Sequence, residues 1–213
     1  MFNIDKVGES ILKKMIKSVM KYIPYIKSIH ETRTTAAPIT LRTFFFQKVI
    51  GINRRAYWPT HFTSMISRAE NIEIGIGTAP GLSPGCYIQG LGKIIIGDYT
   101  LIAPNVGIIS ANHDTHDYRK HIKSEVIIGD YCWIGMNTTI MPGVKLGDHT
   151  IVAAGSVVTK PFEDGYCVLA GSPAKIIKVL ESSECVKYYN EYEYYGYIKK
   201  ENFNNFKKRK LMV

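Results

Sequence analysis

The most regular pattern along the chain is an aliphatic residue at every sixth position in its second half. An amphipathic helix repeats near 3.6 residues and an amphipathic strand near 2, so neither explains this spacing. A six-residue unit predicts a short strand followed by a tight corner, and three units then form one coil of a parallel β-helix. The aliphatic positions of the frame are Ile128, Ile134, Ile140, Leu146, Val152 and Val158.

The period of six is also present earlier in the chain, in a block that starts at Ile76, with two extra residues inserted between Ile88 and Ile96. Single coils cannot bury their own apolar face, so we expect about five coils over residues 71–160 to share one core, within a β-helix domain of residues 71–172. Cys86 and Cys132 fall on the small fifth place of their hexads, which predicts packing residues rather than catalytic thiols. The aliphatic positions of this block are Ile76, Leu82, Ile88, Ile96, Ile102 and Ile108.

The frame is interrupted between Ile108 and Ile128. The segment 110–125, SANHDTHDYRKHIKSE, is almost free of apolar residues. This composition predicts a loop that is extruded from the column of coils. Loops held by a rigid scaffold are where binding and catalytic residues concentrate, so the segment is the first place to look for chemistry.

The regions that flank the repeat carry different patterns. Within residues 1–70, an apolar stripe over Asn3–Lys27 predicts an amphipathic helix that Pro24 ends, followed by irregular, aromatic-rich chain. Residues 173–213 form the last segment, in which a short helix is expected over Ala174–Lys187. The Tyr- and Lys-rich end beyond it carries no clear pattern.

Charge is distributed unevenly. The chain carries 27 Lys and Arg against 18 Asp and Glu, a net charge of +9. Residues 1–60 hold 11 basic and three acidic residues, whereas residues 61–180 hold nine and ten. A nucleic-acid groove across the repeat is therefore not expected. The basic N-terminal helix could instead pack on an oligomer or contact a membrane surface.

Two further features bear on the compartment. No apolar run approaches the roughly 18 residues of a membrane span, and the first residues lack the apolar core of a secretory signal. The four Cys residues form no CxxC pair and are typical of reduced thiols. Together these features predict a cytoplasmic protein.

Four motifs in the repeat resemble those of the hexapeptide-repeat acyltransferases, and most closely their maltose, galactoside and colanic-acid-type sugar O-acetyltransferases. They are WIG at 133–135, PGV at 142–144, AAGSVVTK at 153–160 and GSPAKIIK at 171–178. The resemblance implies a mainly β fold, a left-handed parallel β-helix with an N-terminal helical segment and a short C-terminal helix. It also implies a homotrimer with active sites between subunits, acetyl-CoA as co-substrate and a saccharide acceptor.

His113, in the NHD of the interrupted segment, matches the position of the family's catalytic histidine. Moving an acetyl group from a thioester to a hydroxyl needs a base that works near neutral pH, and imidazole is such a group. A carboxylate from Asp114 or Asp117 could orient the ring. His116 and Arg119 could bind the acceptor or the cofactor.

The resemblance also implies a groove for coenzyme A. The family often has Arg at the positions of Lys175 and Lys178. Lys lacks the guanidinium group that binds phosphate through two hydrogen bonds. Met136 replaces a family serine after WIG. The positions that match the cofactor groove are Trp133, Ala154, Thr159, Lys160, Lys175 and Lys178.

Two alternative functions stay open on the same fold. His116 and His121 have the five-residue spacing of γ-class carbonic anhydrases, which bind zinc with three histidines. Their third histidine should lie about 36 residues upstream, near Pro80, where this chain has none, so no metal is expected. The other alternative is a trimeric scaffold without catalytic activity.

Overall fold

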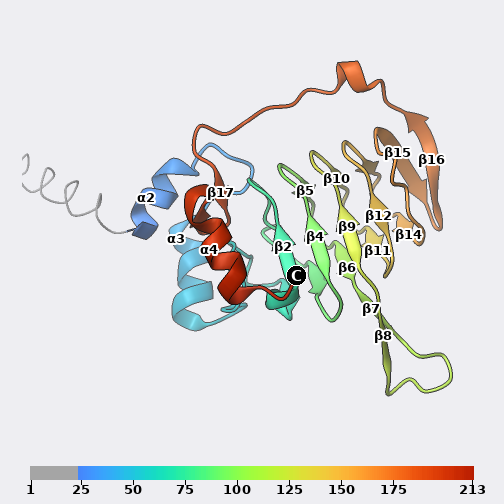
Figure 1. Ribbon diagram of the computed structural model, residues 1–213, viewed down its shortest axis with the longest axis horizontal. Helices are drawn as coiled ribbons and strands as arrows, with labels where there is room; N and C mark the ends of the chain where they lie inside the picture. Colours follow the sequence, from blue (N-terminus) through green and yellow to red (C-terminus); the bar gives the residue numbers. More distant parts are fainter. Residues whose placement is uncertain (1–23) are drawn as a thin grey trace, which may run out of the picture.

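The period-six aliphatic residues line the inside of a column of stacked coils in the computed structural model, which describes residues 24–213 (Figure 1). Ile134, Ile140 and Val152 are fully buried, and the other aliphatic residues of the frame from Ile76 onward are buried too, except Leu82, which is partly exposed. The predicted parallel β-helix is confirmed.

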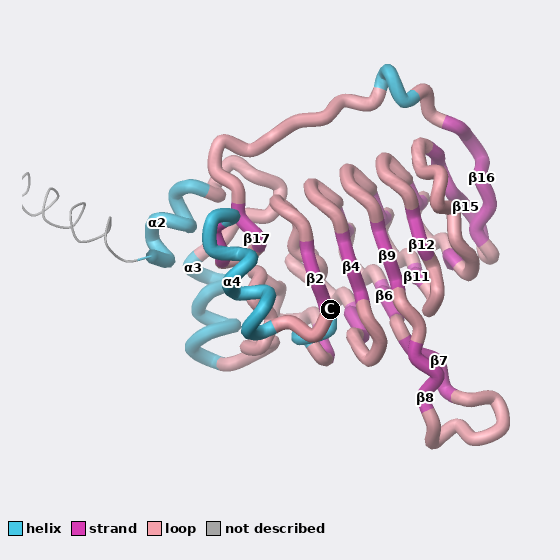
Figure 2. Tube along the Cα trace, in the orientation of Figure 1, coloured by secondary structure: helices cyan, strands magenta, loops and turns pink. Residues whose placement is uncertain are grey.

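Each coil contributes strands to three parallel sheets, which run along the column as its sides (Figure 2). The first sheet contains β1 (Met65–Ser67), β3 (Tyr87–Gln89), β6 (Gly107–Ile109), β11 (Thr139–Ile140) and β14 (Val157–Val158). The second contains β2 (Ile72–Ile74), β4 (Ile94–Ile96), β9 (Val126–Ile128) and β12 (Lys145–Leu146). The third contains β5 (Leu101–Ile102), β10 (Trp133–Ile134), β13 (Ile151–Val152) and β15 (Cys167–Gly171).

Register keeps equivalent residues in line along the column. Ile88 pairs with Ile108, Ile108 with Ile140, and Ile140 with Val158. Where a glycine follows the aliphatic residue, the close stacking of the coils requires it. A Cβ on Gly97 would lie 2.6 Å from the backbone carbon of Gly129. The first sheet begins with β1, six residues before the predicted start of the repeat at residue 71.

The interrupted segment forms a hairpin that leaves the column between the first and second sheets (Figure 2). Its strands are β7 (Ala111–His113) and β8 (His121–Lys123), which pair antiparallel. At its base, the Ser124 amide donates to the Ser110 carbonyl at 2.9 Å. The predicted extruded loop is confirmed.

The corner between the second and third sheets carries two ladders of side chains. The amides of Ile76, Asp98 and Asp130 donate to the carboxylates of Asp98, Asp130 and Asp148 one coil further on, at 2.7 to 2.8 Å. The next residues, Tyr99, Tyr131, His149 and then Tyr166, stack ring on ring at 5.0 to 5.3 Å. Their backbones are left-handed, a conformation that costs about 1–2 kcal/mol for ordinary residues, which ring stacking of about 0.5–1.5 kcal/mol per pair helps to offset.

The expected helix over residues 174–187 is wrong. Ala174–Val179 forms strand β16, which pairs antiparallel with β15 at the end of the third sheet. The β-branched residues Ile176, Ile177 and Val179 favour a strand here. Only a short 3₁₀ turn, η3 (Ser182–Glu184), follows within the predicted range.

The C-terminal helix lies later, at α4 (Lys200–Lys210), after a small hairpin of β17 (Tyr194–Tyr195) and β18 (Ile198–Lys199). The chain reaches it by running back along the column over the aromatic ladder, where Tyr188 contacts Tyr99 and Tyr131. Helix α4 then packs over the first coils (Figure 1).

The lead-in contains helices α2 (Pro24–Glu31) and α3 (Leu41–Phe44) and a π-helix, η1 (Phe45–Ile50); a 3₁₀ turn, η2 (Ala69–Asn71), precedes β2. The region predicted to be irregular is therefore partly helical, and a reciprocal capping box between Thr40 and Thr43 starts α3. Most of the helix predicted over Asn3–Lys27 lies outside the described residues. Pro24 is the first residue of α2 rather than the end of a helix.

We expect Ile134→Ala to lower the free energy of unfolding by about 2–5 kcal/mol, because it leaves a cavity between two coils. Urea unfolding followed by circular dichroism measures the change. Ile177→Ala, at a side chain that is 65% exposed, should change the value by less than about 0.5 kcal/mol. Equal effects of the two changes would contradict the packing described.

Stability should fall in acid through His149. Burial, reinforced by the Lys187 ammonium, lowers the pKa of this ring, whose Nε2 is buried without a partner among the described residues. Below about pH 6.5 an unfolded chain takes up the proton that the folded ring resists, so folding is weakened as the pH falls. His149→Phe keeps a stacking ring without the titration. Urea unfolding at a series of pH values should show that the free energy of unfolding falls less for the variant than for the wild type below pH ~6.5. The same pH dependence in both proteins would refute the assignment to His149.

Candidate functional site

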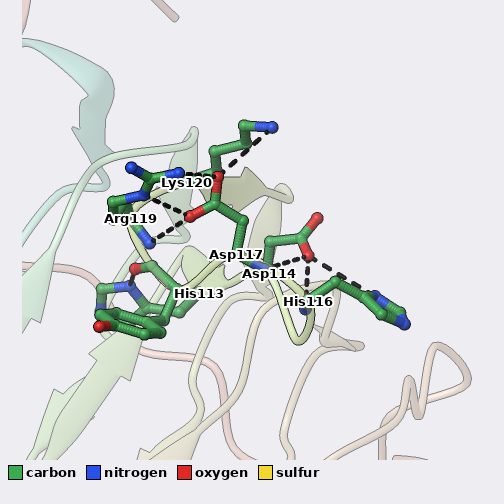
Figure 3. Close-up of polar contacts among 7 residues, drawn as sticks. His113, Asp114, His116, Asp117, Arg119 and Lys120 are labelled. Carbon is green, nitrogen blue, oxygen red and sulfur yellow. Dashed lines mark hydrogen bonds and ion pairs between the residues drawn. The ribbon is translucent and has the colours of Figure 1, made fainter.

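The tip of the β7–β8 hairpin is held in shape by two aspartates (Figure 3). The Asp114 carboxylate accepts from the amides of His116 and Asp117, at 2.8 and 3.1 Å. The Asp117 carboxylate accepts from Arg119 Nε at 2.8 Å and Nη2 at 3.1 Å. These contacts give a polar, exposed loop a defined conformation.

His113 stands at the end of β7 with its ring exposed to solvent. Its Nδ1 is hydrogen-bonded to the backbone carbonyl of Tyr118. A carbonyl oxygen can only accept, so Nδ1 carries the proton in the neutral ring. The lone pair is then on Nε2, the nitrogen that a general base uses.

Both predicted carboxylates make other contacts at the hairpin tip. Asp114 is occupied by backbone amides of the tip, and Asp117 by Arg119 and by Lys120, whose Nζ lies 3.5 Å from the carboxylate. The hydrogen bond from Arg119 lowers the pKa of Asp117. Neither carboxylate is hydrogen-bonded to His113 in this structure, where the Tyr118 carbonyl holds Nδ1 instead. The orienting role of Asp114 or Asp117 stays a prediction.

His121 is a neighbour of His113 that the sequence did not reveal. The two residues face each other in the hairpin register, and their ring centroids are 4.5 Å apart. The two histidines are eight residues apart, a separation that allows them to pair across a hairpin. The sequence does not show where the turn lies, so the pairing could not be predicted. The other predicted tip residues, His116 and Arg119, are exposed.

The predicted cofactor residues divide between parts of the column. Thr159 and Lys160 follow β14 at the corner between the first and second sheets, the corner from which the hairpin leaves. Ala154 follows β13 at the corner between the third and first sheets. All three are exposed. Lys175 and Lys178 lie on β16 and are exposed as well.

Trp133 lies on β10, in the third sheet, and its side chain is 53% exposed. It borders a pocket of 290 Å³ whose lining is mixed and includes the apolar side chains of Leu101 and Ala103. In a three-sided column this sheet is opposite the corner that carries His113. One chain therefore does not bring His113 and Trp133 together.

Three other features bear on the chemistry. Burial raises the pKa of the Cys132 thiol to about 12 and also raises those of Cys86 and Cys167, so the predicted packing role of Cys86 and Cys132 is confirmed. Within residues 24–213, no group of three or more His, Cys, Asp or Glu residues is placed to hold a metal ion. No helix in that range combines the length and hydropathy needed to cross a bilayer.

Comparison with known proteins extends these observations. Residues 125–160 match the family model described as bacterial transferase hexapeptide, six repeats. The chain is 34% identical over 135 residues to a probable macrolide acetyltransferase of Lysinibacillus sphaericus, covering 53% of this chain and 74% of that protein. It is 36% identical over 104 residues to the galactoside O-acetyltransferase of Escherichia coli K12, covering 47% of this chain and 51% of the enzyme. The match thus spans about half of that relative's length.

Among solved structures, the chain resembles a galactoside acetyltransferase in complex with coenzyme A. The TM-score is 0.57 at 25% identity, and the alignment covers 81% of this chain and 90% of the other. The likeness extends beyond the repeat to most of both chains.

The hydrogen bond to Tyr118 predicts that neutral His113 carries its proton on Nδ1. Long-range ¹H–¹⁵N NMR correlations at alkaline pH distinguish the two ring nitrogens. His30, exposed on α2 and without a comparable bond to any residue of 24–213, provides an internal reference. A proton predominantly on Nε2 of His113 would contradict the geometry.

Proposed function

The chain belongs to the hexapeptide-repeat acetyltransferases, and we propose that it transfers an acetyl group from acetyl-CoA to a hydroxyl of a saccharide or polysaccharide precursor. The observation that carries this proposal is the orientation of His113. Its Nδ1 is engaged by the Tyr118 carbonyl, so Nε2 is free to accept a proton from an acceptor at the exposed hairpin.

The proposed reaction is a direct transfer in a ternary complex. As the acceptor oxygen attacks the thioester carbonyl, Nε2 of His113 removes the hydroxyl proton. A tetrahedral oxyanion forms, which backbone amides would stabilise. The C–S bond then breaks, the acetyl ester remains on the acceptor, and the protonated imidazole returns its proton to the leaving sulfur. Atoms and charge balance without any further reactant.

The residues predicted to contact acetyl-CoA have the properties that this substrate requires. The exposed Trp133 and the pocket beside it, with both polar and apolar lining, suit the pantetheine arm, which carries amide groups on an aliphatic chain. Ala154 offers a small corner against which a chain can lie, and Thr159 a hydroxyl. Lys160, Lys175 and Lys178 are exposed cations for phosphate groups. Because Lys contacts phosphate as a point charge, each lysine should contribute separately.

We propose a homotrimer of left-handed columns as the active form. The support is geometric: His113 and Trp133 lie on opposite parts of a single column, so a site that contains both needs two copies of the chain. Neighbouring copies can place the hairpin of one column against the third sheet of the next. His116 and Arg119 at the tip would then contact the acceptor or the adenosine end of the cofactor.

The test is acetyl transfer to a panel of sugars and nucleotide sugars, with products identified by mass spectrometry. We expect His113→Ala to lower the rate by about 10²–10⁴-fold, the usual contribution of a general base. His30→Ala, an equal change at an exposed histidine on α2, should leave the rate unchanged. Full activity of the His113 variant would refute the mechanism.

The same assay separates two kinds of acceptor. An acetyl ester is released by mild alkali, whereas an acetyl amide survives it. Release of the product's acetyl group would support transfer to a hydroxyl. A resistant product would show transfer to an amino sugar and overturn that part of the proposal.

A further inference from the structure

A second pocket lies far along the chain from the hairpin, between the lead-in and helix α4. It has a volume of 390 Å³ and is bordered by the basic residues Lys48, Arg54, Arg55 and Lys210. Aromatic rings of Tyr57 and Tyr197 form part of its wall. Segments from both ends of the described chain therefore build it.

The charge of this pocket is unbalanced. Glu70 is the one acidic residue in its lining. The Glu70 carboxylate lies 3.7 Å from the guanidinium of Arg68, a residue that does not line the pocket. None of the four basic residues pairs with a carboxylate of residues 24–213. Four cations thus border one concave space without a matching anion from the described chain.

Lys48 is fixed in this arrangement. Its Nζ donates to the Ala56 carbonyl at 3.0 Å and lies 4.8 Å from the centre of the Tyr197 ring. Burial and the nearby Arg54 guanidinium lower the pKa of Lys48, which means that its charge is disfavoured as the pocket stands. An anion between the two cations would relieve this repulsion.

We propose that the pocket binds the phosphate or diphosphate group of a ligand whose apolar or sugar portion rests on the aromatic wall. Guanidinium groups bind phosphate oxygens in pairs, and Arg54 and Arg55 are exposed at the mouth of the pocket where they can reach such a group. The half-buried Lys48, held by the Ala56 carbonyl, supplies a third positive charge. The site does not depend on acetyl transfer, and it accounts for part of the positive charge of residues 1–60.

Calorimetric titration of the full chain with inorganic pyrophosphate, in the absence of acetyl-CoA, tests the site. Arg54→Gln and Arg55→Gln should each weaken binding about tenfold, as expected for loss of a charge-assisted hydrogen bond. Arg33→Gln removes the same charge from an exposed position of the lead-in outside the pocket and should have little effect. Thermal melting confirms that the variants fold.

Two results would overturn the proposal: no pyrophosphate binding, or equal weakening by all three substitutions, which would indicate general electrostatic attraction. Sedimentation with phosphatidylcholine vesicles that contain phosphatidic acid, and titration with UDP-glucose, then identify the source of the phosphate. Vesicle binding that needs Arg54 and Arg55 supports a lipid headgroup. UDP-glucose binding with the same dependence supports a soluble phosphorylated sugar. If neither the vesicles nor UDP-glucose bind, the proposal that the pocket binds a phosphorylated ligand is wrong.

Discussion

Each coil of this protein is stable only because the next coil covers it. The inward aliphatic residue of one rung packs on its equivalent in the next, as Ile108 does on Ile140, and a single rung has no other apolar surface to bury. This requirement fixes the register of all three sheets. The aspartate ladder at the corner follows from this register. The carboxylates of Asp98, Asp130 and Asp148 reach the amides of the neighbouring coil only when the rise from coil to coil is constant.

The hairpin uses this rigidity. Its base is closed by Ser110 and Ser124 on the column, and its tip is held by the two aspartates, so the chain between them has little freedom despite its exposure. The ring of His113 is thereby positioned by a backbone carbonyl and not by a carboxylate. A neutral partner fixes the tautomer without adding a negative charge beside the ring.

The period of six was sufficient to predict the column and the extruded segment, because each is a property of local sequence, whereas His113 was singled out by the resemblance to the family. The strand β16 and the path of the tail were not predictable in the same way. Ala174–Val179 becomes a strand by pairing with β15, and Tyr188 is ordered by contact with Tyr99 and Tyr131, far away in sequence. The basic pocket also depends on such long-range contacts, for which a single sequence carries no periodic signal. The partner of His113 is only five residues away, but the contact with the Tyr118 carbonyl depends on the conformation of the hairpin tip.

The placement of α4 has a consequence for synthesis on the ribosome. The first coils are among the earliest parts of the column to be made, yet Tyr57 beside them is covered by Phe206, and Glu73 is paired with Lys207. Rungs can stack in order as they emerge, but the starting end of the column stays uncovered until residue 210 has left the exit tunnel. The end of the column that is made first is therefore the last to be covered.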